Sequence, residues 1–231
     1  LYGEQVSLTT TASHLLFRPL YHEVMMSCPT DWRLGIAPKL GKVLYYNGTS
    51  YTEYTTQAVD RVSTTHIPLD AMEATHYLYM GFTNPVRGFY FTIDGTNKNA
   101  ETATLDMEYC SAISSAGVAT FADVAGDSDL TDTGGATLNV SGLYSFTLPA
   151  VVHGIVVLLG GRDSYWYRFK PSATLSATVD IIDVIPACDT TNYAFMKGGV
   201  VYAPSLNLSQ NGAFEFDHTG TDTLDINWVQ H

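Results

Sequence analysis

The sequence predicts an all-β protein: an antiparallel β-sandwich or jelly-roll-like body with an extended N-terminal arm and C-terminal strands. The first observation is a strict alternation of apolar and polar residues, which is cleanest in Thr104–Tyr109. A period of two places Leu105 and Met107 on one face of a strand and the polar residues on the other. The second observation is that similar segments recur at short spacing, separated by turn-forming pairs such as Gly160-Gly161.

Composition indicates a folded, acidic protein and narrows its partners. Hydrophobic residues make up 45% of the 231 residues, charged residues only 15%, and the formal net charge is -12. Nucleic acids and anionic membranes bind through clustered basic side chains, so this charge balance disfavours both partners. The longest apolar run, Ile155–Leu159, is far shorter than the roughly 20 residues of a membrane-spanning helix. The chain starts at Leu1 with no initiator Met or signal-peptide pattern, so we expect a processed form.

The chain is predicted to divide into three regions. Residues 1–70 would form an N-terminal arm and a β-hairpin region, 71–188 a β-sandwich domain, and 189–231 a C-terminal β extension. The first 40 residues lack a sustained period and carry three prolines, which favours an extended arm. The best local signal is a hairpin over Lys42–Tyr54, because Asn47-Gly48 tolerates the positive φ angles of a tight turn.

The sandwich strands are placed by their apolar alternation and by the turns between them. The apolar positions are odd up to Ile181 and even from Ile182 onward, which predicts a β-bulge at that point. Further strands are expected near 199–203, 213–217 and 223–229. The body strands are predicted at Arg87–Ile93, Thr102–Tyr109, Val118–Val124, Thr137–Val140, Leu143–Leu148, Ile155–Leu159, Tyr165–Phe169 and Ser176–Ile185.

One loop is dense in carboxylates that are suited to calcium. Asp127, Asp129 and Asp132 lie within the segment 126–135 and offer the oxygen ligands that calcium prefers. The segment lacks the glycine at the sixth position and the acidic residue at the twelfth that define the helix-loop-helix calcium loop. A solvated turn is therefore the favoured interpretation, and no metal or other cofactor is expected.

No catalytic pattern is visible, so we do not expect an enzyme. The sequence contains no Gly-x-Ser-x-Gly motif, and the seven histidines show no metal-binding spacing. Cys28, Cys110 and Cys188 are far apart and odd in number. They are interpreted as buried free thiols with at most one bridge.

Several aromatic residues are candidates for a binding surface. Exposed tyrosine or tryptophan rings can stack on sugar rings or dock a protein partner. Aromatic residues are also common in strands for packing alone, so a core or subunit-interface role is the favoured interpretation and ligand binding is the alternative. The candidates are Tyr45, Tyr51, Tyr54, Trp166 and Trp228.

Six strand motifs taken together resemble the structural proteins of tailed bacteriophages, over about half of the chain. In that family the Glu-Tyr strand usually continues into a Trp and a turn, whereas here Glu108-Tyr109 is followed by Cys110 and Ser111. These are strand motifs and not catalytic signatures, so the resemblance implies a class of virion protein. The motifs are His76–Gly81, Gly88–Ile93, Leu105–Tyr109, Tyr144–Pro149, Tyr165–Phe169 and Leu175–Ile181.

The resemblance implies a capsid decoration or cement protein located in the virion. Such a protein would be a homotrimer that contacts other copies of itself and the major capsid protein or other virion proteins, through added strands and aromatic side chains. The expected interface residues are Tyr2, Phe17, Tyr21, Trp32 and Trp228. Two alternatives are a tail-fibre, spike or baseplate subunit, and a monomeric carbohydrate-binding β-sandwich module. A hydrolase is a more distant fourth possibility.

Overall fold

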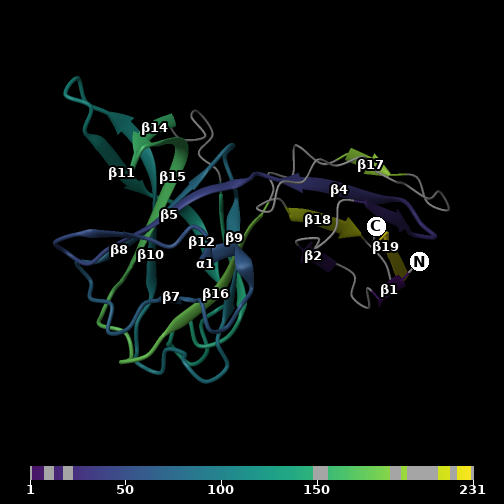
Figure 1. Ribbon diagram of the computed structural model, residues 1–231, viewed down its shortest axis with the longest axis horizontal. Helices are drawn as coiled ribbons and strands as arrows, with labels where there is room; N and C mark the ends of the chain where they lie inside the picture. The colour runs from purple at the N-terminus through teal and green to yellow at the C-terminus, as the bar shows by residue number, and fades with distance from the viewer. Residues whose placement is uncertain are drawn as a thin grey trace. The chain divides into compact units, whose positions relative to one another are not determined.

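The computed structural model describes residues 2–7, 13–17, 23–147, 156–187, 194–196, 213–218 and 223–229. These residues form two compact units, which are drawn in Figure 1. The sandwich unit comprises Pro38–Ala187, and the terminal unit combines Leu1–Ala37 with Cys188–His231. The described secondary structure is almost entirely antiparallel strand, so the predicted all-β class is confirmed.

The first sheet of the sandwich unit has seven strands in the order β11-β10-β15-β8-β5-β6, with β14 paired to β15 beside β10. Strand β15 is central because it pairs with β8 on one side and with β10 and β14 on the other. The strands are β5 (Leu40–Tyr46), β6 (Tyr51–Glu53), β8 (Tyr77–Phe82), β10 (Leu105–Ile113), β11 (Ala119–Asp123), β14 (Val156–Leu159) and β15 (Arg162–Pro171).

The second sheet has five strands in the order β12-β13-β9-β16-β7. Its apolar side chains, including Phe89 and Phe91, share one buried cluster with Met80 and Phe169 of the first sheet. The two sheets therefore enclose a common core, as in a β-sandwich. The strands are β7 (Ile67–Pro68), β9 (Gly88–Ile93), β12 (Ala125–Asp129), β13 (Gly142–Thr147) and β16 (Asp180–Ala187), and the short helix α1 (Gln57–Asp60) precedes β7.

Two local predictions are confirmed in detail. The hairpin around Asn47-Gly48 joins β5 to β6, with a φ angle of 84° at Gly48. The Asn47 side chain accepts hydrogen bonds from the N–H groups of Thr49 and Ser50, which fixes the turn. The predicted bulge is also present, because the register between β16 and β9 shifts between Ile181 and Asp183.

Around the acidic segment one predicted strand is absent and one observed strand was not predicted. The stretch 137–140 forms turns and bends, with Leu138 at a φ angle of 55°. Strand β12 was missed because Gly126-Asp127 reads as a turn, whereas the structure accommodates it as an irregularity between Ala125 and Ser128 in the pairing with β13. Gly126 has a φ angle of 61°, a left-handed conformation that favours glycine.

The division of the chain also differs from the predicted ranges 1–70, 71–188 and 189–231. The sandwich unit starts at Pro38, because β5 of the predicted N-terminal region pairs along its length with β8. The predicted arm and the predicted C-terminal extension instead belong to one unit. Both changes arise from pairing between strands far apart in sequence, which local patterns do not encode.

The terminal unit contains two small antiparallel sheets of strands from both ends of the chain. Their orders are β1-β19-β3 and β17-β4-β18-β2. Tyr2 is opposite Trp228 in the first, and Phe17 is opposite Phe214 in the second. Within the described residues no helix is long and apolar enough to span a membrane. The strands are β1 (Tyr2–Ser7), β2 (Ser13–Phe17), β3 (Glu23–Ser27), β4 (Trp32–Ala37), β17 (Ala194–Met196), β18 (Ala213–His218) and β19 (Thr223–Val229).

Candidate binding surface

The seven-stranded sheet carries a second apolar layer on the face that is turned away from the core. Strand alternation sends Leu78 and Met80 into the core, so Tyr77 and Tyr79 lie on the opposite face. Trp166 lies on this outer face too, and its Nε1 donates to the Val157 carbonyl at 2.9 Å. We call this side the outer aromatic face. It is defined by Tyr46, Tyr51, Tyr77, Tyr79, Phe121, Trp166 and Arg168.

Arg168 on β15 lies between two aromatic rings of this face. Its guanidinium carbon is 4.1 Å from the centre of the Tyr77 ring and 4.2 Å from the centre of the Phe121 ring. Its Nε donates to Glu108, the residue opposite it on β10. A cation held between two rings and a carboxylate gains both cation–π attraction and a charge-assisted hydrogen bond. Arg168 therefore joins β8, β10, β11 and β15 on one face.

Tyr79 is the buried centre of the aromatic network. Its hydroxyl accepts a hydrogen bond from the Arg168 guanidinium at 3.1 Å, and its ring contacts those of Tyr51, Tyr77 and Phe121. Burial raises the pKa of the Tyr79 hydroxyl to about 12, although the hydrogen bond from Arg168 acts in the opposite direction. The hydroxyl consequently stays protonated at neutral pH.

Tyr51 forms the open edge of the network. It lies on the edge strand β6 and is 53% exposed, whereas Tyr79 is 6% exposed. The ring centres of Tyr46 and Tyr51 are 4.8 Å apart with an interplanar angle of 36°. The Tyr46 hydroxyl donates to the Gly48 carbonyl at 2.6 Å, which holds the supporting ring in place. An accessible ring thus rests on a fixed ring beneath it.

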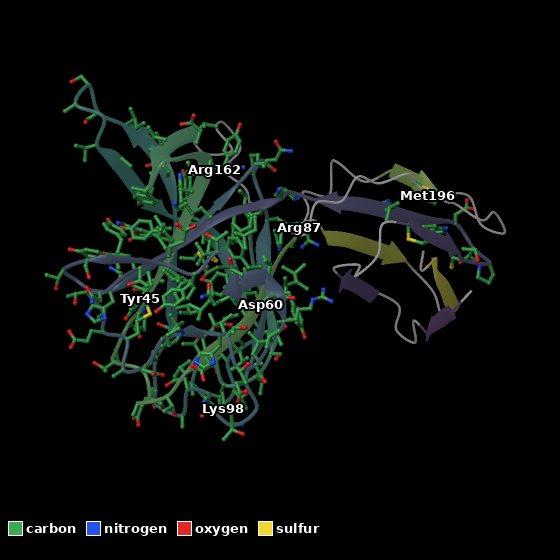
Figure 2. All side chains as sticks on the ribbon, in the orientation of Figure 1. Tyr45, Asp60, Arg87, Lys98, Arg162 and Met196 are labelled. Atoms are coloured by element: carbon green, nitrogen blue, oxygen red, sulfur yellow. The ribbon has the colours of Figure 1, made fainter. Side chains whose placement is uncertain are left out.

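An ion pair lies on the same face, next to the tyrosine pair. Lys42 Nζ is 2.9 Å from a Glu53 carboxylate oxygen and also donates to the Gly160 carbonyl. Hydrogen bonds from Lys42 and then Thr55 lower the pKa of the Glu53 carboxyl. Glu53 is two residues from Tyr51 on β6, so both side chains lie on one face. Arg162, labelled in Figure 2, starts β15 at the end of the sandwich unit where β14 lies.

The acidic segment 126–135, considered above as a calcium loop and interpreted as a solvated turn, forms a hydrogen-bonded network in the described residues. Asp129 accepts hydrogen bonds from the N–H and hydroxyl of Thr131 and from the Thr137 hydroxyl. Asp127 accepts from the Tyr144 hydroxyl at 2.5 Å, and Asp132 accepts from the Gly135 N–H at 2.8 Å. The three carboxylates bind separate donors and do not converge on one point. Within the described ranges no group of three or more histidine, cysteine or acidic side chains is arranged to hold a metal ion.

The other predicted residues fall in different places. Trp32 is buried, and Tyr2 and Trp228 are opposite one another in β1 and β19. Phe17 lies on β2, and Tyr21 falls outside the described residues.

The predicted aromatic and cysteine candidates also separate by burial. Tyr51 is exposed, which fits the alternative of a binding surface, whereas Trp166 is 1% exposed and packs beneath the surface, as the favoured packing interpretation predicts. Tyr45, labelled in Figure 2, is partly buried, and its hydroxyl is 3.0 Å from His76 Nδ1. Cys28 and Cys110 are buried free thiols.

Sequence reasoning missed the residues that organise this surface, namely Arg168, Glu108, Tyr79 and Phe121. Arg168 lies on the same face of β15 as Trp166, a position that the alternation of Tyr165–Lys170 is consistent with. The strand order that brings Glu108 and Tyr79 to either side of it depends on pairing across the sheet. One signal in the sequence could have indicated this surface. Tyr77 and Tyr79 alternate with Leu78 and Met80, so this strand has no polar face.

Comparison with known proteins finds no matching family model, no matching curated protein and no matching solved structure.

Proposed function

We propose that this protein is a structural subunit of a virus particle, of the kind that decorates or cements a capsid. The observation that carries the proposal is the terminal unit, in which strands from both ends of the chain pair with each other apart from the sandwich unit. A decorating subunit needs a stiff body and a separate means of attachment. This division of the chain supplies both parts.

The terminal unit has features suited to attachment by strand addition. Its sheets have three and four strands, so their edge strands offer backbone hydrogen-bonding groups to a neighbouring chain. Three of the five residues expected at the interface, Tyr2, Phe17 and Trp228, lie on strands of this unit, whereas Trp32 is buried within it. The proposed partners are other copies of the chain and capsid proteins, with a trimer as the proposed assembly. The resemblance of the strand motifs to tailed-bacteriophage structural proteins supports the same class.

Location on the particle tests this proposal. Antibodies raised against the purified full chain would be applied to particles of the virus whose genome encodes this sequence. Gold labelling would be read by electron microscopy. We expect label over the capsid shell, and pre-incubation of the antibody with purified protein should remove it. Label confined to the tail would favour the alternative of a fibre, spike or baseplate subunit. Unlabelled particles would contradict the virion assignment.

A carbohydrate-binding module is the second candidate function, favoured by the exposed Tyr51 ring and the ion pair beside it. If carbohydrate binding were the whole function of the protein, we would expect the chain to be a monomer. Light scattering on the purified chain separates the two: a mass near 25.2 kDa favours the module, and a mass near three times that value favours the trimeric particle subunit.

A further inference from the structure

We propose that the outer aromatic face binds an uncharged glycan, with the Tyr51 ring as the stacking platform. This goes beyond the proposed function, because attachment to the particle is assigned to the terminal unit and glycan binding to the sandwich unit. A particle subunit can carry both activities, and each can fail without the other.

The ring geometry is the first step of the argument. The Tyr51 side chain is 53% exposed. Its ring contacts Tyr46 at 4.8 Å and Tyr79 at 5.8 Å between centres. Tyr46 is held by its hydrogen bond to Gly48, and Tyr79 by its hydrogen bond from Arg168. A supported ring loses little conformational freedom when the C–H face of a sugar stacks on it.

The polar groups beside the platform are the second step. Glu53 lies on the same face of β6, with its side chain 53% exposed. It contributes carboxylate oxygens that accept hydrogen bonds, and the neighbouring Lys42 ammonium contributes donors. Sugars present several hydroxyls around an apolar ring face, so they require an aromatic plane flanked by donors and acceptors. Tyr51, Glu53 and Lys42 supply that combination.

The balance of charged side chains on the outer aromatic face indicates which class of ligand it binds. Three acid–base pairs of this face are matched across strands: Lys42 with Glu53, Arg168 with Glu108, and Lys170 opposite Asp106. Asp123 on β11, opposite Glu108, adds one acid, and Arg162 on β15 adds one base, so the numbers of acids and bases stay equal. A nearly balanced face offers no net attraction to a charged polymer, and the chain's net charge of -12 repels polyanions. The uncharged glycan is the occupant that fits both the balanced charge and the open ring.

The test is binding of the full chain to a printed array of neutral gluco-, manno-, galacto- and xylo-oligosaccharides, with polygalacturonate as the charged comparison. Retardation in native gels containing the matching neutral polysaccharide would confirm each hit. We expect binding to at least one neutral class and none to polygalacturonate. Tyr51→Ala should weaken binding roughly tenfold or more, the size expected for one aromatic contact.

Three further variants separate ring stacking from general damage. Tyr51→Phe keeps the ring and should keep most of the binding. Tyr46→Ala removes the support and should weaken binding even if Tyr51→Ala fails to fold. Leu130→Ala changes a side chain that is 60% exposed next to β12, in the other sheet, and should leave binding unchanged.

Four results would overturn the proposal. These are the absence of binding to every neutral class, equal binding by Tyr51→Ala, equal loss in Leu130→Ala, and a light-scattering mass that falls to 25.2 kDa only in Tyr51→Ala. The last result would assign the face to a second copy. Gold labelling of particles is unaffected by any of them, so the proposed function is judged separately.

Discussion

The two faces of the seven-stranded sheet are built by the same strands but are completed in different ways. The inner face is closed by the five-stranded sheet, and Phe82, Phe89 and Phe169 are fully buried there. Among the described residues of the sandwich unit, no second sheet covers the outer face, and its aromatic side chains contact one another and Arg168. Alternation therefore yields a sealed core on one side and a layer that is partly open to a ligand on the other.

Removing a ring from the inner face should have the largest effect. Phe89→Ala deletes a side chain that stacks on Phe82 at 5.3 Å and contacts Tyr167 at 5.5 Å between ring centres. We expect the free energy of unfolding to fall by about 4 kcal/mol, because the ring's transfer energy is lost and a cavity remains. The change in the free energy of unfolding is measured by urea titration, with tryptophan fluorescence as the signal. A loss below about 1 kcal/mol would mean that the core repacks and the inner face is not sealed.

Breaking the ion pair on the outer face should have a smaller effect. Arg168→Ala leaves the largely buried Glu108 carboxylate without its guanidinium. We expect a loss of about 2 kcal/mol, below the range for fully buried pairs because water reaches both side chains. The double variant Glu108→Gln, Arg168→Met removes both charges and should lose less than the single variant. If both variants unfold at the same urea concentration, the unpaired Glu108 carboxylate does not account for the loss of stability.

Alkaline pH should weaken the outer face through Tyr79. Its pKa is about 12 in the folded chain and about 10 when unfolded. The folded state holds this proton more tightly, so the stabilisation is complete below pH 10 and is lost as pH rises toward 12. Between pH 10 and 11, the wild type should lose about 1 kcal/mol more unfolding free energy than Tyr79→Phe. Urea unfolding of both proteins at both pH values measures this difference. Equal losses of unfolding free energy in the wild type and in Tyr79→Phe would contradict the prediction.

The smallest effect is expected at the open edge of the outer face. Tyr51→Ala should change the unfolding free energy by no more than about 0.5 kcal/mol, because the side chain is half exposed on an edge strand. Thermal unfolding by circular dichroism is sufficient to measure it. A residue that contributes little to stability but much to glycan binding would sharpen the contrast between the two faces. A large loss of stability would instead place Tyr51 with the core.

Local features were predictable where neighbouring residues determine them. The Asn47-Gly48 turn and the bulge at Ile182 both follow from short-range patterns, and both are present. The failure at 137–140 has a specific cause: its apolar alternation resembles a strand, but Leu138 adopts a positive φ angle while Thr131 and Thr137 bind Asp129. A side-chain network overrode the local pattern.

The candidate surface was predictable only in part. Tyr51 was selected from its strand context, and its exposure agrees. Trp166 was selected for the same reason and is buried, because β14 lies beside it and accepts its indole N–H. Grouping Arg168 with Glu108, Tyr77 and Phe121 requires the order of four strands, which no single segment encodes.

The terminal unit pairs strands that are far apart in the sequence, and this pairing constrains the order in which the chain folds during synthesis. Tyr2 is paired with Trp228, so strand β1 cannot meet this partner until synthesis has passed β19. The sandwich unit, which lies between them in sequence, can fold while synthesis continues. The first strands must wait unpaired during that time, with edges that other chains can capture. The terminal unit is therefore completed after the sandwich unit, and until then the unpaired strands of a newly made chain can pair with other chains.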